Sequence, residues 1–514
     1  MNSDGVRDHH GELVPELSKS AKKMNYERLL NTPLPTYDSN YPGSPFWMEF
    51  GYFGLRRTQS CIFRTLEITG TEKIPTDRGT LCAAWHTNGI IDITCIFLSH
   101  PKKFVIGGRH DLVTRSILGF WARKFAVQPV VRKAELLRGG CSEEEATKLN
   151  GRSLLSLATG ISHGYACALF PEGTSHSESH LIRLRTGPMR TALAAAAHAK
   201  SIESNPPVII PIGLHFRIRH KFRTDAWIEY GEPIQVPYEN LNHELVEAVK
   251  NGEWAEPPAE DVIALRDELE AKLSPLTPAK PTHSEYRADQ LIAHVKARIS
   301  KTPLVSWRKE VLAARKVRDN PPSNEILQLS EKIGERLHNS GLDGRDINKN
   351  ATGLRGFSLG GALTGSIKTV FALVMLPLIL LSQFPQIMLG RVLGDNTDEG
   401  QDARVSFQFL VGMFGSLFLW PILSILTILS LIFFSNKINS TFGVDWLNLY
   451  GGSPIYQLTV ILLIFVFNII SYWLAGRAFA WGWDPISDTA KFGSRLKNGS
   501  KFKSDLIKLR ELME

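Results

Sequence analysis

The sequence predicts an α/β domain with a mixed sheet flanked by helices, then a helical region, and finally transmembrane helices near the C-terminus. Three observations lead to this prediction. Between residues 68 and 236, short apolar runs alternate with helical stretches, which is typical of strands and helices packed in layers. Residues 240–346 are polar but keep apolar positions at helical spacing. Three later segments lack charged side chains over lengths that suit a bilayer.

The N-terminal part of the chain, residues 1–44, is predicted to be a polar segment. Residues 1–23 contain no apolar stretch, so we expect no secretory signal peptide there. In residues 45–66 the aromatic side chains share one helical face: Phe46, Phe50 and Phe53. This pattern predicts an amphipathic helix in a membrane interface. A helix that packs on the domain behind it would show the same pattern.

Residues 67–240 are predicted to form the α/β domain. Five apolar runs indicate buried strands: residues 80–84, 103–106, 168–170, 208–214 and 227–230. Helical stretches lie between them, at residues 112–124, 153–163 and 188–198. Residues 241–350 are predicted to be a helical accessory region, because apolar residues recur at helical spacing, as in Ile263, Leu265, Leu269 and Leu273.

Residues 366–476 are predicted to contain the transmembrane segments, and residues 477–514 a basic cytoplasmic tail. Three stretches lack charged side chains: residues 369–390, 405–434 and 456–476. About 20 apolar residues span a bilayer core, so each stretch is long enough, and the middle one is too long for a straight span. The acidic loop 391–404 is typical of a non-cytoplasmic loop. An even number of spans, with one segment re-entrant, would place the α/β domain and the tail together on the cytoplasmic side.

The composition excludes several protein classes. The chain has 514 residues, of which 43% are hydrophobic and 21% charged, so it is not mainly disordered or fibrous. The net charge of +8 is compatible with an anionic membrane or a phosphate-bearing substrate. No soluble segment interleaves basic with aromatic residues, so we expect no nucleic-acid binding. The five cysteines are scattered without a CxxC pair, which indicates neither a disulfide framework nor a zinc ribbon.

His86 and Asp92 follow the apolar run at residues 80–84 and form the first candidate constellation. A neutral histidine can take a proton from an attacking hydroxyl, and an acidic partner fixes its tautomer. Residues six apart lie on different faces of a regular helix, so a contact between them requires a turn. Asn88 and Gly89 supply the residue types for that turn. A histidine and an aspartate without a joint role remain the alternative.

Further candidate residues are those of a turn and two arginines, Arg132 and Arg185. The turn follows the run at residues 168–170 and is made of Glu172, Gly173, Thr174 and Ser175. Glycine permits a close backbone approach and the hydroxyls can donate, so such a turn suits a phosphate or an oxyanion. Arg132 follows a strand and Arg185 lies downstream of the turn, and a guanidinium matches phosphate oxygens. An ordinary strand-exit turn and surface arginines are the alternatives.

Taken in this order, the motifs resemble those of the glycerolipid acyltransferase superfamily, which includes glycerol-phosphate and lysophosphatidate acyltransferases. The resemblance covers residues 63–236, about a third of the chain. It implies that His86 is a general base and that Asp92 orients it. It also implies a set of substrate-binding residues: Arg132, Glu172, Gly173, Thr174, Ser175 and Arg185. Five residues separate His86 from Asp92, where four are commonest in the family. That longer spacing is similar to the glycerol-3-phosphate/dihydroxyacetone-phosphate branch.

The resemblance implies a membrane-bound acyltransferase of phospholipid synthesis. It would transfer a fatty acyl group from a thioester donor, acyl-CoA or acyl-carrier protein, to the hydroxyl of glycerol-3-phosphate or dihydroxyacetone phosphate. The expected partners are the acyl donor, the acceptor and membrane lipid, and no cofactor or metal is expected. A lysophospholipid or lysophosphatidate acyltransferase, or a non-catalytic lipid-binding membrane protein, remains the alternative.

Two competing chemistries have weaker support in the sequence. Residues 356–360 fit the GxSxG pattern of serine hydrolases around Ser358, but the residues before it are polar and not strand-like. Four histidines are candidate metal ligands: His176, His180, His215 and His220. They do not follow an HExxH arrangement, so satisfied or exposed histidines are the preferred interpretation.

Overall fold

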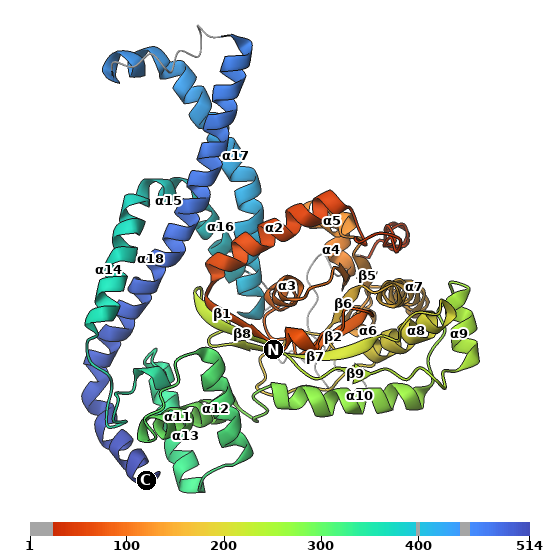
Figure 1. The fold of residues 1–514 in the computed structure, drawn as a ribbon, viewed down its shortest axis with the longest axis horizontal. Helices are drawn as coiled ribbons and strands as arrows, with labels where there is room; N and C mark the ends of the chain where they lie inside the picture. The colour runs from red at the N-terminus through yellow and green to blue at the C-terminus, as the bar shows by residue number, and fades with distance from the viewer. Residues whose placement is uncertain (1–23, 397–400, 443–452) are drawn as a thin grey trace.

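The computed structural model describes residues 24–396, 401–442 and 453–514 (Figure 1). Its central element is a seven-stranded sheet in the order β1-β8-β7-β2-β6-β3, with β9 paired to β7. The strands are β1 (Phe63–Thr69), β2 (Thr80–Ala84), β3 (Phe104–Val105), β6 (Ala166–Leu169), β7 (Val208–Phe216), β8 (Thr224–Tyr230) and β9 (Ile234–Gln235). β7 pairs with β8 and β9 in antiparallel fashion, and the other pairs are parallel. The sheet is therefore mixed, which confirms the predicted fold class.

Alternation along the strands gives the sheet two apolar faces. In β2, Cys82 and Ala84 face one core, while Leu81 and Ala83 face the other. The first face is covered by α2 (Pro45–Ile62) and α3 (Ile90–Ser99). The second is covered by α7 (Glu143–Ser162), α8 (Gly187–Ser201), α9 (His243–Lys250) and α10 (Ala259–Leu273). Figure 1 shows these layers with α3 above the sheet and α10 below it.

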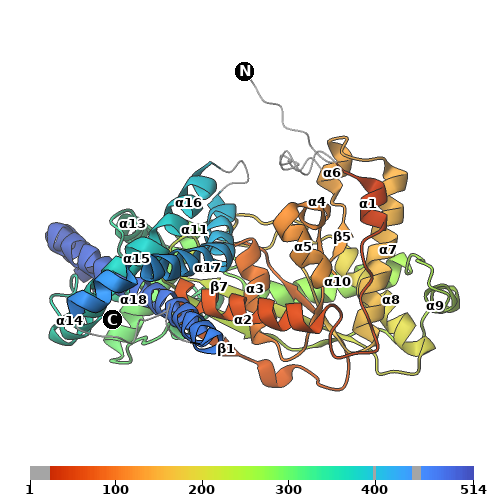
Figure 2. The ribbon, with the colours of Figure 1, turned by 90° about the horizontal axis from the view of Figure 1, so that it is seen from above.

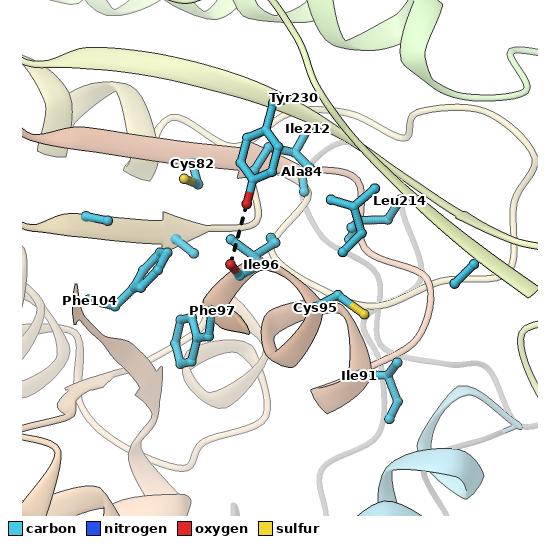
Figure 3. Packing of buried hydrophobic residues seen from close by; sticks show 14 of the residues in the cluster. Cys82, Ala84, Ile91, Cys95, Ile96, Phe97, Phe104, Ile212, Leu214 and Tyr230 are labelled. Atoms are coloured by element: carbon cyan, nitrogen blue, oxygen red, sulfur yellow. Dashed lines mark hydrogen bonds between the residues drawn. The ribbon is translucent and has the colours of Figure 1, made fainter. Parts of the chain in front are cut away.

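Helix α3 is fixed on the sheet by a closely packed core (Figure 3). The rings of Phe97 and Phe104 are 4.5 Å apart between centroids. The hydroxyl of Tyr230 lies 2.7 Å from Ser99 Oγ and 3.5 Å from the carbonyl oxygen of Ile96. Because α3 begins beside the His86 loop, this packing also fixes the position of Asp92.

Several short elements differ from the sequence prediction. The interface helix ends at Ile62, and residues 63–66, which the prediction includes in it, form the start of β1. β1 is an edge strand in which Arg64 and Thr65 are exposed and polar, so its apolar signal is weak. The predicted helix 112–124 is divided at Arg115 into α4 (His110–Thr114) and α5 (Ser116–Lys124). A second, two-stranded parallel sheet joins β4 (Gly107–Arg109) and β5 (Gln128–Val130).

The remaining short helices are α1 (Tyr26–Leu30) and α6 (Lys133–Leu137).

The accessory region consists of α11 (His283–Ile299), α12 (Trp307–Asp319) and α13 (Asn324–Asn339). These helices share a core with the last part of α18 (Pro454–Glu511), through Phe502, Leu506 and Leu509. Arg217 at the end of β7 lies 2.9 Å from Asp225 and 2.5 Å from Glu310 of α12, and all three side chains are buried. The accessory region therefore packs both on the sheet and on the C-terminal end of α18. Figure 2 shows α11, α13 and α18 at the same end of the molecule.

The apolar C-terminal part consists of α14 (Leu359–Val374), α15 (Leu376–Ser382), α16 (Phe384–Asp395), α17 (Gln401–Phe442) and α18. By length and composition, α17 and α18 can each cross a membrane, and α14 with α15, bent by 62°, would add a third span if that pair is one span. Figure 1 shows α17 and α18 extending together beyond the rest of the molecule. Large apolar side chains point outward from them, such as Phe433 and Phe467. The protein is therefore a membrane protein.

The acidic stretch 391–404, which the sequence analysis treats as a non-cytoplasmic loop, is helical at both of its described ends, in α16 and α17. Its described ends lie beside the α/β domain, where Asp395 and Arg404 are 2.8 Å apart. At the start of α17, Ser406 Oγ accepts a hydrogen bond of 3.0 Å from the Ile90 N–H of α3. This contact joins the start of α17 to α3 of the α/β domain.

Candidate active site

The predicted contact between His86 and Asp92 is present. Gly89, at φ +51°, turns the chain into α3 and brings Asp92 Oδ2 to 2.9 Å from His86 Nδ1. The backbone N–H groups of Thr87 and Asn88 donate to the same oxygen, at 2.8 and 2.7 Å. Three donors thus converge on one oxygen of a carboxylate that is fully buried. This arrangement places the Nδ1 proton toward Asp92 and leaves Nε2 of His86 as the proton acceptor.

The plane of the His86 ring is fixed by the turn that follows β6. Phe170 stacks on the imidazole with ring centroids 3.9 Å apart and an interplanar angle of 16°. The His86 side chain is 17% exposed, so one edge of the ring remains open to a substrate. The stacked phenyl ring excludes water from one face of the base and limits its rotation.

Glu172 joins the two motifs through its buried carboxylate. One oxygen, Oε2, accepts from the His86 N–H at 2.7 Å. The other, Oε1, accepts from the Ile182 N–H at 3.1 Å and lies 2.7 Å from His176 Nε2. The resemblance implies that Glu172 binds substrate, but both of its oxygens contact protein donors here. An anionic carboxylate also repels a phosphate, so the geometry favours a role in holding the His86 loop against the turn.

The rest of the turn is compact and lies against Arg185. Gly173 adopts φ +74°, a conformation that favours glycine, and its N–H donates to the Phe170 carbonyl at 3.1 Å. A Cβ atom at Gly173 would lie 3.4 Å from Arg185 Cγ. The Arg185 N–H donates to the Pro171 carbonyl at 2.6 Å. Thr174 and Ser175 follow within the turn, and Thr174 Oγ1 lies 3.3 Å from the Ser175 carbonyl. The structure therefore brings Gly173, Thr174, Ser175 and Arg185 together with His86.

Arg132 occupies a separate position after β5 and is engaged by a neighbouring carboxylate. Its Nε and Nη2 atoms lie 2.9 and 2.6 Å from Glu135 Oε1. Its backbone N–H donates to Glu135 Oε2 at 2.6 Å. β4 continues the course of β3, which is parallel to β6, and β5 is parallel to β4. The carboxyl ends of β5 and β6 therefore point in the same direction, and a phosphate that binds Arg132 must compete with Glu135.

Sequence reasoning missed Arg219, which lies between β7 and β8. Its Nη1 atom donates to the carbonyl oxygens of Thr87 and His176, at 3.0 and 2.7 Å. No motif marks this residue, because it contacts backbone atoms of segments far away in the sequence. The compact core of the sheet determines which loops meet there.

The competing sites of the sequence analysis have other structural roles. Ser358 is the N-cap of α14, and its Oγ accepts from the Gly361 N–H at 3.3 Å, without a strand before it. His215 contacts Glu229 at 3.4 Å, and His180 contacts the Lys280 carbonyl at 3.2 Å. Within residues 24–396, 401–442 and 453–514, no group of three His, Cys, Asp or Glu side chains is arranged around a possible metal ion.

Comparison with known proteins supplies the family. Residues 65–215 match the family model described as Acyltransferase, a stretch that contains His86, Asp92, Arg132 and the turn around Glu172. The chain therefore contains a segment that is similar to this family. We refer to residues 65–215 as the acyltransferase domain.

Two curated relatives come from the yeast Saccharomyces cerevisiae. Glycerol-3-phosphate O-acyltransferase 2 is 27% identical over 220 residues, which cover 41% of this chain and 28% of that protein. Glycerol-3-phosphate O-acyltransferase 1 is 34% identical over 82 residues, which cover 15% of this chain and 10% of that protein. The chain thus spans less than a third of the length of these relatives. Among solved structures, the 1-acyl-sn-glycerophosphate acyltransferase PlsC from Thermotoga maritima aligns at 16% identity with a TM-score of 0.28, covering 44% of this chain and 80% of that chain.

Proposed function

We propose that the protein is a membrane-bound O-acyltransferase that moves a fatty acyl group from a thioester to the hydroxyl of a glycerol phosphate. The observation that carries this proposal is the His86–Asp92 pair, whose 2.9 Å contact leaves Nε2 of His86 free to accept a proton. The printed names of the yeast relatives support glycerol-3-phosphate as the acceptor. Dihydroxyacetone phosphate shares the phosphate and the hydroxyl, and the donor is acyl-CoA or acyl-carrier protein.

The proposed reaction needs one base and no covalent enzyme intermediate. His86 Nε2 removes the hydroxyl proton as the oxygen attacks the thioester carbonyl, and a new C–O bond forms. Asp92 stabilises the imidazolium that results. Collapse of the tetrahedral intermediate breaks the C–S bond, and the leaving thiolate takes the proton from His86. Backbone N–H groups near the turn would stabilise the oxyanion.

The acceptor phosphate would bind to Arg132 and Arg185. A guanidinium presents paired donors that match phosphate oxygens. Arg185 lies directly against Gly173, so a phosphate held there would be close to the turn. Arg132 would exchange its Glu135 partner for the phosphate. Thr174 and Ser175 would add hydroxyl donors, and the residues need no metal or cofactor in this scheme.

The acyltransferase domain would lie at the cytoplasmic surface of the membrane. On α2, Phe46 and Phe53 are 69% and 55% exposed, as an interface helix requires. The same helix touches the apolar spans, since the Arg57 guanidinium lies 5.2 Å from the ring centroid of Trp473 in α18. An acylated product formed here would be close to the lipid that receives it.

The test is acyl transfer by the purified full-length protein from radiolabelled palmitoyl-CoA. Glycerol-3-phosphate and lysophosphatidate are offered in parallel, with His86→Ala as the blank. Label in lysophosphatidate from glycerol-3-phosphate is the expected result. Label only in phosphatidate would show a lysophosphatidate acyltransferase instead. Full activity of His86→Ala would overturn the assignment of the base.

A further inference from the structure

Arg219 connects the two loops that carry the candidate catalytic groups. Its Nη1 atom donates to Thr87 O and His176 O, and Nη2 donates to Ser177 Oγ at 2.5 Å. In return, Asn88 Nδ2 donates to the Arg219 carbonyl at 3.2 Å. One guanidinium therefore joins the residue after His86 to the segment after Glu172. These contacts are local to the candidate active site, although Arg219 belongs to none of its motifs.

The peptide group between Thr87 and Asn88 links Arg219 to Asp92. Its carbonyl oxygen accepts from the guanidinium at 3.0 Å, while its N–H donates to Asp92 Oδ2 at 2.7 Å. A cation at the carbonyl polarises the peptide and strengthens the hydrogen bond that its N–H donates. Asp92 Oδ2 is the same oxygen that contacts His86 Nδ1. Hydrogen bonds thus connect the Arg219 guanidinium to His86 through one peptide group and one carboxylate.

The neighbouring peptide offers an internal comparison. The carbonyl of His86 accepts from the His176 N–H at 3.0 Å, and the Thr87 N–H donates to Asp92 Oδ2 at 2.8 Å. Both peptides therefore point an N–H at Asp92 and accept a hydrogen bond at their carbonyl. Only the Thr87–Asn88 peptide has a cation as that donor.

We propose that Arg219 is a positioning residue for acyl transfer, which sets the strength of His86 as a base through the Thr87–Asn88 peptide and Asp92. The effect on catalysis rests on the proposed function. The hydrogen-bonded connection from Arg219 through the Thr87–Asn88 peptide and Asp92 to His86, which we call the relay, is a property of the fold. With Arg219 in place, the Asn88 N–H that donates to Asp92 is polarised and takes up part of the negative charge of the carboxylate. Asp92 then offers less negative charge to the imidazolium that forms at His86 during acyl transfer.

The accessory region fixes the same segment from its other side. Ser179 Oγ donates to the Lys280 carbonyl at 2.7 Å, and His283 Nε2 of α11 lies 2.8 Å from the Ser177 carbonyl. Burial lowers the pKa of His283, the hydrogen bond to the Ser177 carbonyl opposes this, and the charge of Arg219 lowers it further. The positive charge of Arg219 therefore acts on the neighbouring imidazole of His283. The other titratable and charged groups around the relay are Glu172, His176 and Glu178 after β6, His220 beside Arg219, and Arg404 on α17.

The experiment compares Arg219→Gln with wild-type protein, using the full-length chain in detergent. Reaction of His86 with diethyl pyrocarbonate requires the neutral imidazole, and mass spectrometry of the His86 peptide follows it from pH 5 to 8. The initial rate of acyl transfer from palmitoyl-CoA to glycerol-3-phosphate is measured over the same range. We expect both pH midpoints to rise by about half a unit in Arg219→Gln, because a nearby positive charge is lost.

Lys221→Gln is the matched control, since it removes one positive charge from the same loop and has no hydrogen bond to the Thr87 carbonyl among the described residues. Its midpoints should equal those of the wild type. Arg219→Lys keeps the charge but cannot reach both carbonyls in the same way, so we expect a lower kcat with a smaller midpoint shift. If Arg219→Gln does not fold, as judged by its melting transition, Arg219→Lys is compared with the wild type in its place.

Equal midpoints in wild type, Arg219→Gln and Lys221→Gln would overturn the proposal, as would wild-type kcat and midpoint in Arg219→Lys. Equal shifts of the pH midpoints in Arg219→Gln and Lys221→Gln would also overturn it. The effect would then come from the positive charge of the loop as a whole and not from the hydrogen bonds of Arg219. A shift of the His86 modification midpoint without acyl transfer in the wild type would support the relay and count against the proposed function.

Discussion

The two halves of the candidate site are held in different ways. At the ends of β2 and β6, His86 already has its partner Asp92 at 2.9 Å, and Phe170 stacks on its ring. At the end of β5, Arg132 also has a partner, but that partner is Glu135, at 2.6 Å. Under the proposed function, the first contact prepares a base for its reaction, whereas the second neutralises a cation that would bind the acceptor.

This difference separates proton transfer from acceptor binding. The base half is ordered by protein contacts alone, so no substrate is needed to assemble it. In the acceptor half, a phosphate must displace the Glu135 carboxylate from the Arg132 guanidinium. We therefore expect substitutions at the base to change kcat and substitutions around Arg132 to change the KM for the acceptor.

The largest effect is expected from His86→Ala. Loss of the general base should lower kcat by about 10²–10⁴-fold while the KM for the acceptor changes little. Steady-state kinetics with glycerol-3-phosphate measures both constants, and an unchanged melting transition shows that the variant is folded. A variant that loses acceptor affinity at constant kcat would break the division between the two halves.

Asp92→Asn should lower kcat by about 10²-fold, at the lower end of the range for general base catalysis, because the amide cannot stabilise the imidazolium. The double variant His86→Ala/Asp92→Asn should be no slower than His86→Ala, since the two side chains act as one unit. Single-turnover rates of the three variants provide the measurement. Additive losses would mean that Asp92 acts independently of His86.

Arg132→Ala should raise the KM for glycerol-3-phosphate by about 10–100-fold, as expected for the loss of a charged hydrogen bond. The KM for palmitoyl-CoA and kcat should change much less. Lys148→Ala removes an exposed cation from α7 and is the matched control. Equal effects on both substrates would place Arg132 outside the acceptor site.

A smaller effect of opposite sign is expected from Glu135→Gln. The amide holds Arg132 less strongly than the carboxylate does, so the guanidinium is more available to phosphate. The KM for the acceptor should fall severalfold at constant kcat. A rise in KM would show instead that Glu135 orients Arg132 for binding.

The smallest effect concerns stability, and it belongs to the base half. His100 follows α3 and contacts Thr80 of β2 at 3.2 Å, so it joins the two elements that carry the pair. Burial, with a contribution from the charge of Lys102, lowers the pKa of His100 to about 4. The unfolded chain takes up this proton near pH 6.5, so stability should fall as the pH is lowered from about 6.5 to 4.

Melting temperatures at pH 7, 5.5 and 4.5 measure this dependence. His100→Asn should show a shallower decline than the wild type, whereas His243→Asn, at an exposed position, should follow the wild-type curve. Parallel declines in all three proteins would exclude His100 as a source of the acid sensitivity.

Much of the fold was predictable because its signals are local. The runs at residues 80–84 and 208–214 alternate with helical stretches, and both lie in strands of the sheet. β1 was missed because it lies at the edge of the sheet with polar side chains exposed, and β4 was missed because three residues are too few for a pattern. The strand expected before Arg132 is present as β5. In the site, the turn at Asn88-Gly89 was predictable from residue type. The partners of Glu172 and Arg132 were not, because a charge in a motif does not show which neighbour neutralises it.

The sequence by itself determined the alternating α/β domain, the apolar spans and the motifs that carry His86, Asp92 and the turn after Phe170. These features depend on side-chain periodicity and on residue types within a few positions of each other. Only the tertiary structure decided that Arg219 reaches Thr87 and His176, that Glu172 holds the His86 loop, and that α17 begins against α3. Such contacts join segments that are distant in the chain, and they depend on how the packed sheet and helices place their loops in space.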